Sequence, residues 1–453
     1  MRFRSLFLLL SLLVVAVGGG AAVQPATYQW QTLSAAPSNG QKQDDVFFLD
    51  VQRGWAVNGS GRIYRTLNSG QTWAQQVQQT GTYFRCDGFV DSLRGFAGNI
   101  GTNYFPGVTD TNPLYRTLDG GQTWTVVTQL TGPTPVGLCA LQVVTPQVIY
   151  AAGRVGGPAH LLKSTDGGQT WTSRVLNPAI AMITDVHFVS ADTGFVFGGS
   201  NANIQLSRGL VLYTTNCGAT FTEVYRSANT FEMVWKASFP SRRTGYLTLL
   251  SYAPNVPARF VAKTLDGGLK WQELTFAQNG CKEFGIGFAD DSTGWVGTDT
   301  GTGYQTRDGG QTWQPATLGR YINKVRLLRD GAGQVIGGYA IGLNLTKLTV
   351  TTTAPTAVAP AAPAKSALGL SVSPNPASRQ LTIRYRLNRR QRVSIDLTDA
   401  TGRVVATALH NAAKAAGDHA DAYTLPANLP NNVVWLRLRT EEGTDSTAVS
   451  VQP

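Results

Sequence analysis

Acidic residues recur along this 453-residue chain, and paired acids are the first chemistry they allow. Two carboxylates facing each other across a cleft hydrolyse glycosidic bonds, one as an acid and the other as a base or nucleophile. Recurrence at equivalent positions instead favours roles in turns and strand edges, where an acid accepts bonds from nearby backbone N–H groups. The acids concerned are Asp44, Asp45, Asp50, Asp87, Asp185, Asp290 and Asp291. We therefore assign no catalytic residue among them.

Other chemistries have still less support. The four histidines, His160, His187, His410 and His419, are unpaired in the sequence. His187 occupies a strand position that Phe47 fills earlier in the chain, which favours a packed side chain over a catalytic base. No nucleophile elbow, phosphate loop or dinucleotide fingerprint occurs in a proper context. Metal-ligand spacing is absent as well. We expect no cofactor and no metal.

An eight-residue turn of the form Ser/Thr-x-Asp/Asn-x-Gly-x-x-Trp/Phe recurs six times at a spacing of about 48 residues, a period typical of propeller blades. Local Asp-to-backbone bonds explain its spacing, glycine tolerates a positive φ, and the aromatic ring packs on a neighbouring blade. We predict a purely structural role for the acid or amide positions Asn68, Asp119, Asp166, Asn216, Asp266 and Asp308. The same holds for the ring positions Trp73, Trp124, Trp171, Phe221, Trp271 and Trp313.

The strand pattern around these turns predicts an all-β chain. Residues 23–350 are expected to form a seven-bladed β-propeller, because residues 321–350 add strands without a turn motif. The strand at 28–33 is expected to complete this last blade and so to remove an exposed sheet edge. A Thr/Ala/Pro linker follows at 351–365. Seven short strands in residues 366–453 predict a small Ig-like β-sandwich.

Composition and charge indicate an exported protein. Residues 1–22 read as a signal peptide, with Arg2 and Arg4 before the apolar run 6–17. The mature chain has no further apolar stretch of membrane-spanning length. The formal charge is +11, but only 14% of residues are charged and no basic run occurs, so we expect no nucleic-acid partner. Of the four cysteines, Cys86 and Cys139 are the best disulfide candidates.

Three resemblances sharpen this interpretation. The turns resemble the Asp-box (BNR-like) repeat of sialidase-like propellers. The longer unit 45–50, 54–57 and 63–66 resembles the propellers of the photosystem II assembly factor family over residues 28–350. Residues 371–377, 381–383, 393–397 and 401–405 resemble the type A sorting domain of type IX secretion. That resemblance implies recognition of residues 366–453 by the secretion machinery, and a secreted or outer-membrane-attached location.

Binding residues are expected at one mouth of the ring. Aligning the first strands of the blades puts seven residues in one register, either as a polar surface for partners or as solvated strand starts. They are Asp45, Cys86, Cys139, Asp185, Lys236, Gly285 and Lys324. The long loops 102–113, 200–208 and 251–259 connect second and third strands, and such loops on a rigid scaffold commonly bind ligands. They carry Tyr104, Phe105, Arg208, Tyr252 and Arg259.

The sequence therefore predicts an exported, non-catalytic binding or scaffold propeller at the cell surface or outside it. The alternative is a glycan-acting hydrolase or a carbohydrate-binding module on the same ring. The Phe-Arg-Ile-Pro type of strand that marks sialidases is absent, and residues 24–50 hold no arginine. Enzymatic activity stays open, and the partner is a protein or a glycan whose identity the sequence does not reveal.

Overall fold

The computed structural model describes residues 26–37, 42–253, 259–276, 282–351, 368–398, 404–426, 429 and 433–451. The chain divides into two compact units, one spanning Ala26–Thr352 and the other holding the C-terminal part. The predicted signal peptide and the predicted linker from residue 352 onward lie outside the described residues. Within the described residues, no helix is both long and apolar enough to cross a membrane.

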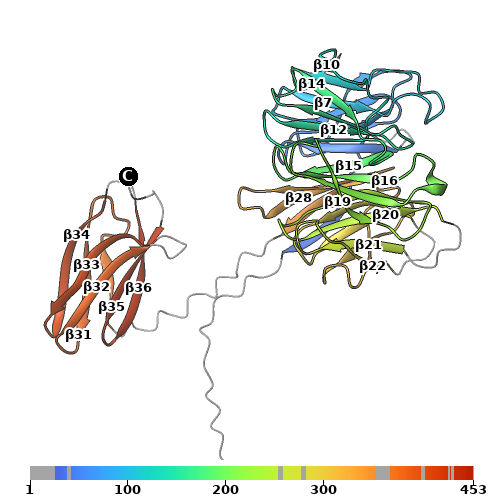
Figure 1. The fold of residues 1–453 in the computed structure, drawn as a ribbon. Helices are drawn as coiled ribbons and strands as arrows, with labels where there is room; N and C mark the ends of the chain where they lie inside the picture. Colours follow the sequence, from blue (N-terminus) through green and yellow to red (C-terminus); the bar gives the residue numbers. More distant parts are fainter. Residues whose placement is uncertain are drawn as a thin grey trace, which may run out of the picture. The chain divides into compact units, whose positions relative to one another are not determined.

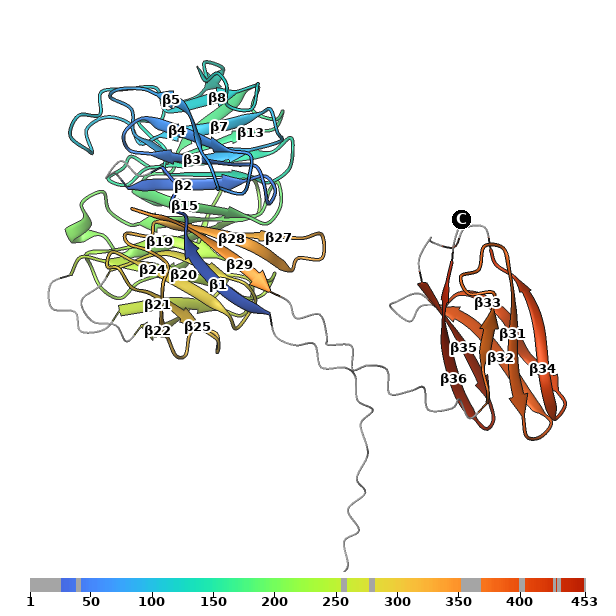
Figure 2. The same ribbon diagram turned by 180° about the vertical axis from the view of Figure 1, so that it is seen from behind.

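The first unit is a seven-bladed β-propeller (Figures 1 and 2). Its blades are four-stranded antiparallel sheets, apart from blade three, which gains a short parallel strand. Blade one holds β2 (Gln43–Phe48), β3 (Gly54–Asn58), β4 (Arg62–Thr66) and β5 (Ala74–Gln78). Blade two holds β6 (Phe84–Phe89), β7 (Gly95–Asn99), β8 (Leu114–Thr117) and β9 (Thr125–Val126). Blade three holds β10 (Leu130–Thr131), β11 (Ala140–Val143), β12 (Ile149–Gly153), β13 (His160–Ser164) and β14 (Trp171–Val175).

The remaining blades follow the same plan. Blade four holds β15 (Met182–Phe188), β16 (Gly194–Gly199), β17 (Gly209–Thr214) and β18 (Thr222–Arg226), with a short 3-10 helix at Ile204–Leu206. Blade five holds β19 (Glu232–Ser238), β20 (Gly245–Ser251), β21 (Arg259–Thr264) and β22 (Gln272–Phe276). Blade six holds β23 (Glu283–Phe288), β24 (Gly294–Thr298), β25 (Gly303–Thr306) and β26 (Gln314–Ala316). Blade seven holds β27 (Lys324–Arg329), β28 (Val335–Ile341), β29 (Leu345–Thr351) and β1 (Thr27–Thr32).

The last blade is closed by the N-terminal strand, which confirms that prediction. Strand β1 pairs antiparallel with β29 along its whole length, from Thr27 opposite Thr351 to Thr32 opposite Thr346. Figure 2 shows the two strands side by side. Joining the two ends of the ring in one sheet leaves no open blade edge at the closure.

The Asp-box turns are held by their own side chains. In the first box, the Thr66 hydroxyl donates to Asn68 Oδ1 at 3.0 Å and accepts from the Gly70 amide at 2.9 Å. Asn68 Oδ1 also accepts from the Thr72 amide at 2.9 Å, and Trp73 Nε1 donates to the Gly70 carbonyl at 3.1 Å. The positive φ of Gly70, 80°, makes glycine favourable there. These bonds satisfy the turn without a ligand.

The C-terminal unit is a small β-sandwich. One sheet joins β30 (Ser371–Ser373), β31 (Gln380–Leu387) and β34 (Gly417–Thr424). The other joins β33 (Val404–Lys414), β32 (Gln391–Thr398), β35 (Val433–Thr440) and β36 (Gly443–Ser450). Alternate residues of β31 and β32 point inward, so that Leu381, Ile383, Val393 and Ile395 form the core with residues of β35. The predicted Ig-like sandwich is confirmed.

Candidate functional site

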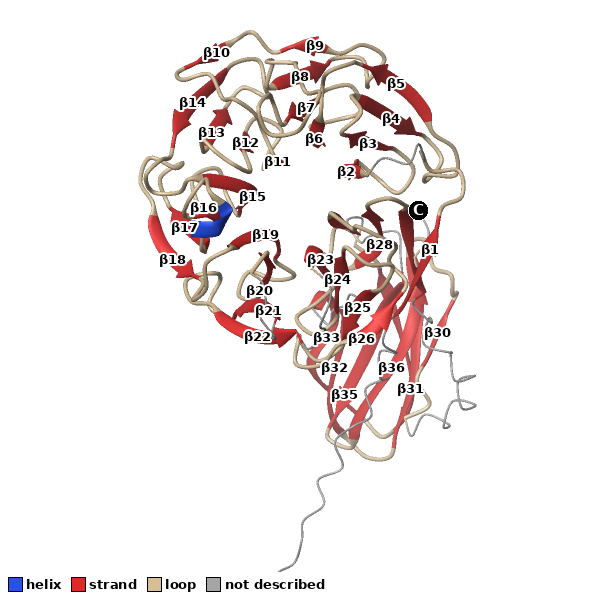
Figure 3. Ribbon diagram, turned by 90° about the vertical axis from the view of Figure 1, so that its right-hand side faces the viewer, coloured by secondary structure: helices blue, strands red, loops and turns tan. Residues whose placement is uncertain are grey.

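The two faces of the propeller carry different connections. Each blade runs outward from its first strand, so the Asp-box turns and the first-to-second connections share one face, called the box face below. The second-to-third and the blade-to-blade connections share the other, called the loop face. Figure 3 shows the ring viewed along its axis. The strands nearest the axis include β2, β6, β11, β15, β19 and β23. Side chains of these inner strands meet at the ring centre.

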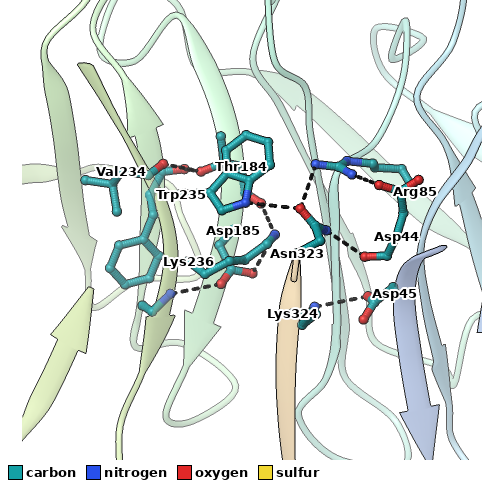
Figure 4. Close-up of polar contacts among 12 residues, drawn as sticks. Asp44, Asp45, Arg85, Thr184, Asp185, Val234, Trp235, Lys236, Asn323 and Lys324 are labelled. Carbon is teal, nitrogen blue, oxygen red and sulfur yellow. Dashed lines mark hydrogen bonds and ion pairs between the residues drawn. The ribbon is translucent and has the colours of Figure 1, made fainter. Parts of the chain in front are cut away.

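A buried polar network links blades one, two, five and seven near the loop face (Figure 4). Arg85 forms an ion pair with Asp44, and both side chains are buried. Asn323 donates to the Asp44 carbonyl at 2.6 Å, and its Oδ1 accepts from Trp235 Nε1 at 3.1 Å. The Arg85 guanidinium lies 5.1 Å from the centroid of the Trp235 ring. One amide side chain therefore connects strands far apart in the sequence.

Deeper in the ring, Asp45 is the partner of two cations. Lys324 Nζ lies 3.0 Å from Asp45 Oδ2, and Arg326 Nη2 lies 3.3 Å from the same atom. Burial alone would raise the pKa of Asp45, but the charges of Lys324 and Arg326 outweigh it and lower the pKa. Asp45 is thus ionised, and the two cations balance its charge. The residue is 1% exposed. It supports the ring and has no open access to solvent.

Asp87, in contrast, is stabilised only by the more distant charges of Arg326 and Lys324. Its side chain is fully buried, and neither carboxyl oxygen has a hydrogen-bond partner among the described residues. Burial raises the pKa of Asp87 well above its ordinary value, and the neighbouring Asp45 charge raises it further. Asp87 is therefore the group of this centre that favours the protonated form. The sequence placed Asp87 among the recurring acids but did not distinguish it from the others, because its environment comes from three different blades.

A second ion pair lies on the blade-four and blade-five side. Lys236 Nζ donates to the Thr184 carbonyl at 2.6 Å and lies 3.7 Å from Asp185 Oδ1. Burial lowers the pKa of Lys236, while the Asp185 charge opposes that shift. Thr184 also donates to the Val234 carbonyl at 2.6 Å. These contacts join two blades through side chains that the sequence analysis had treated as binding candidates.

The first-strand register is therefore corrected in one respect. Asp45, Cys86, Asp185 and Lys236 are buried, so they form neither a surface for partners nor solvated strand starts. Lys324 is half-buried, and Gly285 abuts the backbone of Lys324 in the next blade. In blade one, Asp45 pairs with Val57, the fourth residue of β3. The fourth residue of β12 in blade three is Ala152, and its partner is Ala140 and not Cys139. Sequence alignment of the strands missed this one-residue slip.

The predicted Cys86–Cys139 disulfide is wrong. Both cysteines are free thiols, and Cys217 is free as well, while Cys281 lies outside the described residues. The slip in blade three places the two thiols in different clusters. Cys86 packs with Phe96 and Leu138, whereas Cys139 packs with Ile100, Met182 and Trp235 at the loop-face mouth.

Above the buried network, aromatic side chains reach the surface of the loop face. Tyr104 and Phe105 from blade two are 40% and 38% exposed, and Tyr252 from blade five is 44% exposed. Phe105 stacks on Tyr83 with 4.8 Å between ring centroids and meets Tyr104 edge-on at 4.7 Å. Burial raises the pKa of Tyr104 to about 12, and the Tyr252 phenol adds to that rise. We call Tyr104, Phe105 and Tyr252 the aromatic patch.

Cations surround this patch. Lys282 Nζ lies 4.6 Å from the centroid of the Tyr252 ring, and Lys42 Nζ lies 5.1 Å from that of Phe284. The order of the strands confirms that the three long loops connect second and third strands and share one face. Arg208 has a different position, because its guanidinium donates to the carbonyls of Ser227 and Ala228 and braces the next connection. The side chain of Arg259 lies outside what the structure describes.

The loop-face mouth combines carboxylates with exposed aromatic rings. The carboxylates at the ring centre are buried, and Asp44, Asp45 and Asp185 each have a cation, whereas Asp110 and Asp299 in the loop-face connections are half-buried. A glycoside hydrolase needs two acids that both reach a bound substrate. The exposed surface instead offers ring faces and ammonium groups, which bind by area, stacking and charge. Fold and site thus define a rigid propeller with an aromatic, cation-bordered mouth.

Comparison with known proteins places both units. Residues 371–423 match the family described as the secretion system C-terminal sorting domain. The chain therefore carries a sorting domain of type IX secretion, which directs export to the cell surface or the medium. A xyloglucanase from Paenibacillus sp. is 27% identical over 220 residues, which cover 44% of this chain but only 21% of that enzyme.

Solved structures confirm the propeller. YCF48 from Cyanidioschyzon merolae has a TM-score of 0.54 at 16% identity, covering 71% of this chain and 99% of that one. A structure described as YCF48 bound to D1 peptide has a TM-score of 0.51 at 15% identity, covering 71% and 96%. At such identities the likeness shows the fold alone. The first unit thus has the propeller fold seen in YCF48.

Proposed function

We propose that this protein is an exported, non-catalytic binding module that holds its ligand on the aromatic patch of the loop face. The observation that carries this proposal is the exposure of Tyr104, Phe105 and Tyr252 above carboxylates that are buried and ion-paired. Exposed aromatic rings on a rigid scaffold lose little conformational entropy on binding, and they are enriched in binding hot spots. The sorting domain supplies delivery to the outside of the cell.

An extended protein segment is the ligand we favour. The patch spans the ring from blade two to blade five and is bordered by Lys282, so it suits a chain with apolar and acidic side chains. A propeller of the same fold, YCF48, has been solved with a peptide, which supports this class of ligand. The likeness to a xyloglucanase over part of the chain supports the second candidate, a glycan ligand or substrate.

A crosslinking experiment on the exported full-length protein tests the binding face. A photo-crosslinking amino acid at Phe105 should capture a surface protein from intact cells, whereas the same group at Leu118 on the box face should not. The double variant Tyr104→Ala/Tyr252→Ala should weaken that interaction at least about tenfold, because each truncated hot-spot ring costs about 1 to 2 kcal/mol. Leu118→Ala is the matched control, since Leu118 is also exposed.

Two results would contradict the proposal. Equal capture from Phe105 and Leu118 would remove the loop face as the binding surface. Release of reducing sugar from xyloglucan by the purified wild type would replace the binding module with a hydrolase.

A further inference from the structure

A pocket of about 740 Å³ opens on the box face, opposite the aromatic patch. It lies where blades four and five meet, beneath the connection between β27 and β28 of blade seven. Its wall includes His187, Phe195, Tyr213, Phe239 and Arg242. Its volume falls within the range of about 300 to 1,000 Å³ found for small-molecule sites.

The pocket marks a departure from the blade repeat. At four other interfaces, the aromatic residue of a second strand stacks flat on the ring that ends the first strand of the next blade. The centroid separations are 3.6 Å for Trp55–Phe89, 3.5 Å for Tyr150–Phe188, 3.5 Å for Tyr246–Phe288 and 3.6 Å for Phe48–Tyr339. The corresponding pair Phe195–Phe239 is separated by 5.6 Å. Here the two blades leave space between their rings.

A missing hydroxyl explains part of this difference. Tyr150 donates to the Ala191 carbonyl at 2.7 Å, and Tyr246 donates to the Asp291 carbonyl at 2.7 Å. Both bonds tie a second strand to the turn of the next blade. Phe195 has no hydroxyl to make the equivalent bond, which would go to the Arg242 carbonyl. No hydrogen bond of this kind therefore holds the turn at Arg242 in blade five against the Phe195 ring in blade four.

His187 occupies the space next to Phe239. Their rings stack at 4.4 Å between centroids and 4° between planes. Burial lowers the pKa of His187 to about 4, against an opposing effect of Asp185, so the imidazole is neutral at neutral pH. Within the described chain, neither ring nitrogen has a hydrogen-bond partner. The wall thus combines aromatic side chains with imidazole nitrogens of His187 that make no hydrogen bond to the described residues.

The charged groups of the pocket are cationic. Arg329 is part of the frame, since its guanidinium donates to the carbonyls of Phe288, Ala289 and Gly333. Arg242 is exposed and forms no ion pair with the described residues. The lining contains no acidic side chain, but it includes four hydroxyl-bearing residues: Ser190, Thr193, Tyr213 and Ser241.

We propose that this pocket binds an acidic sugar residue of an extracellular polysaccharide. The sugar ring lies in the pocket against His187, Phe195 and Tyr213, and the hydroxyl groups of the wall face those of the sugar. The carboxylate pairs with Arg242, whose planar guanidinium matches a carboxylate with two parallel bonds. Ser190 and Thr193 donate to Asp192, and Ser241 accepts from the Thr244 amide, so each of these oxygens can still make a further hydrogen bond with a sugar hydroxyl. This site is separate from the aromatic patch and does not depend on it.

Calorimetric titration of the full chain with trigalacturonate tests the site, with neutral cellotriose as the second arm. We expect saturable binding of trigalacturonate and at least tenfold weaker binding of cellotriose. Phe195→Tyr should weaken trigalacturonate binding at least tenfold, because the new hydroxyl closes the gap to the next blade. Arg242→Gln should lower trigalacturonate affinity to the cellotriose level.

Matched controls keep the test specific. Tyr246→Phe removes the same hydroxyl from the neighbouring interface and should leave binding unchanged, as should Tyr104→Ala on the loop face. Thermal unfolding of each variant shows that the propeller is folded. Three results would overturn the proposal: no saturable binding by the wild type, full binding by folded Phe195→Tyr, or equal affinity for the acidic and neutral sugars.

Discussion

Aspartates of the Asp-box turns and aspartates of the ring centre have opposite environments. In the box, the Asp119 carboxylate accepts a hydrogen bond from the Thr123 hydroxyl at 2.6 Å and one from the Thr123 amide at 2.9 Å. These bonds lower the pKa of Asp119 to about 2. At the centre, burial and a like charge raise the pKa of Asp87. An ionised aspartate therefore stabilises the fold in the box, as at Asp119, and destabilises it at the ring centre, as at Asp87.

The difference lies in where the partners come from. Every partner of Asp119 is within four residues along the chain, so each box brings its own donors. The partners of Asp44 and Asp45 lie 41 and about 280 residues away, in other blades. A local turn is insensitive to changes elsewhere in the ring. The central network instead makes the blades depend on one another.

The largest expected effect comes from removing the cation of the buried pair. Arg85→Ala leaves the Asp44 carboxylate buried, with Lys42 Nζ 4.0 Å away as its remaining cation. We expect a loss of about 3 to 5 kcal/mol in unfolding free energy, measured by urea denaturation. Arg53→Ala, in an exposed pair with Asp50, is the control and should cost less than about 1 kcal/mol. A loss of similar size in both variants would mean that burial of the central pair has no consequence.

The next effect concerns the box. Asp119→Ala removes three local hydrogen bonds, from the Thr117 hydroxyl and from the Thr123 amide and hydroxyl, and we expect a loss of about 1 kcal/mol, because exposed bonds compete with water. A lowered pKa contributes stability above the unfolded value of about 3.8 and loses it as the pH falls toward 2. The difference in Tm between wild type and variant should therefore be largest at pH 5 to 7 and shrink toward pH 2. A difference independent of pH would point to the turn geometry and away from the carboxylate.

The smallest effect should have the opposite sign. Asp87→Asn keeps the shape of the side chain and removes its ionisation. A raised pKa costs stability as the pH rises above about 3.8, so the variant should match the wild type at pH 3.5 and have the higher Tm at pH 7. Thermal unfolding at the two values measures this. A lower Tm for Asp87→Asn at pH 7 would show that ionised Asp87 supports the network.

Prediction from the sequence succeeded where the information was local or periodic. The Asp-box spacing led to the blades, and the leftover strand at 28–33 led to the closure that Thr27 and Thr351 form. It failed for Cys139, because a shift of one residue within blade three is invisible in a strand aligned by pattern alone. The placement of Tyr104 and Tyr252 on one face followed from strand order, whereas the stacking of Phe105 on Tyr83 depends on the tertiary structure.

By itself, the sequence determined the repeat, the turn chemistry, the number of blades, the sandwich and its sorting motif, since each depends on residues a few positions apart or on a fixed period. Only the tertiary structure decided which charges are paired, why Asp87 and His187 have shifted pKa values, and where the Phe195–Phe239 interface opens. Those properties depend on burial and on partners from other blades. Electrostatic energies depend strongly on the distance between charges and on their burial, and a pattern of residues gives neither quantity.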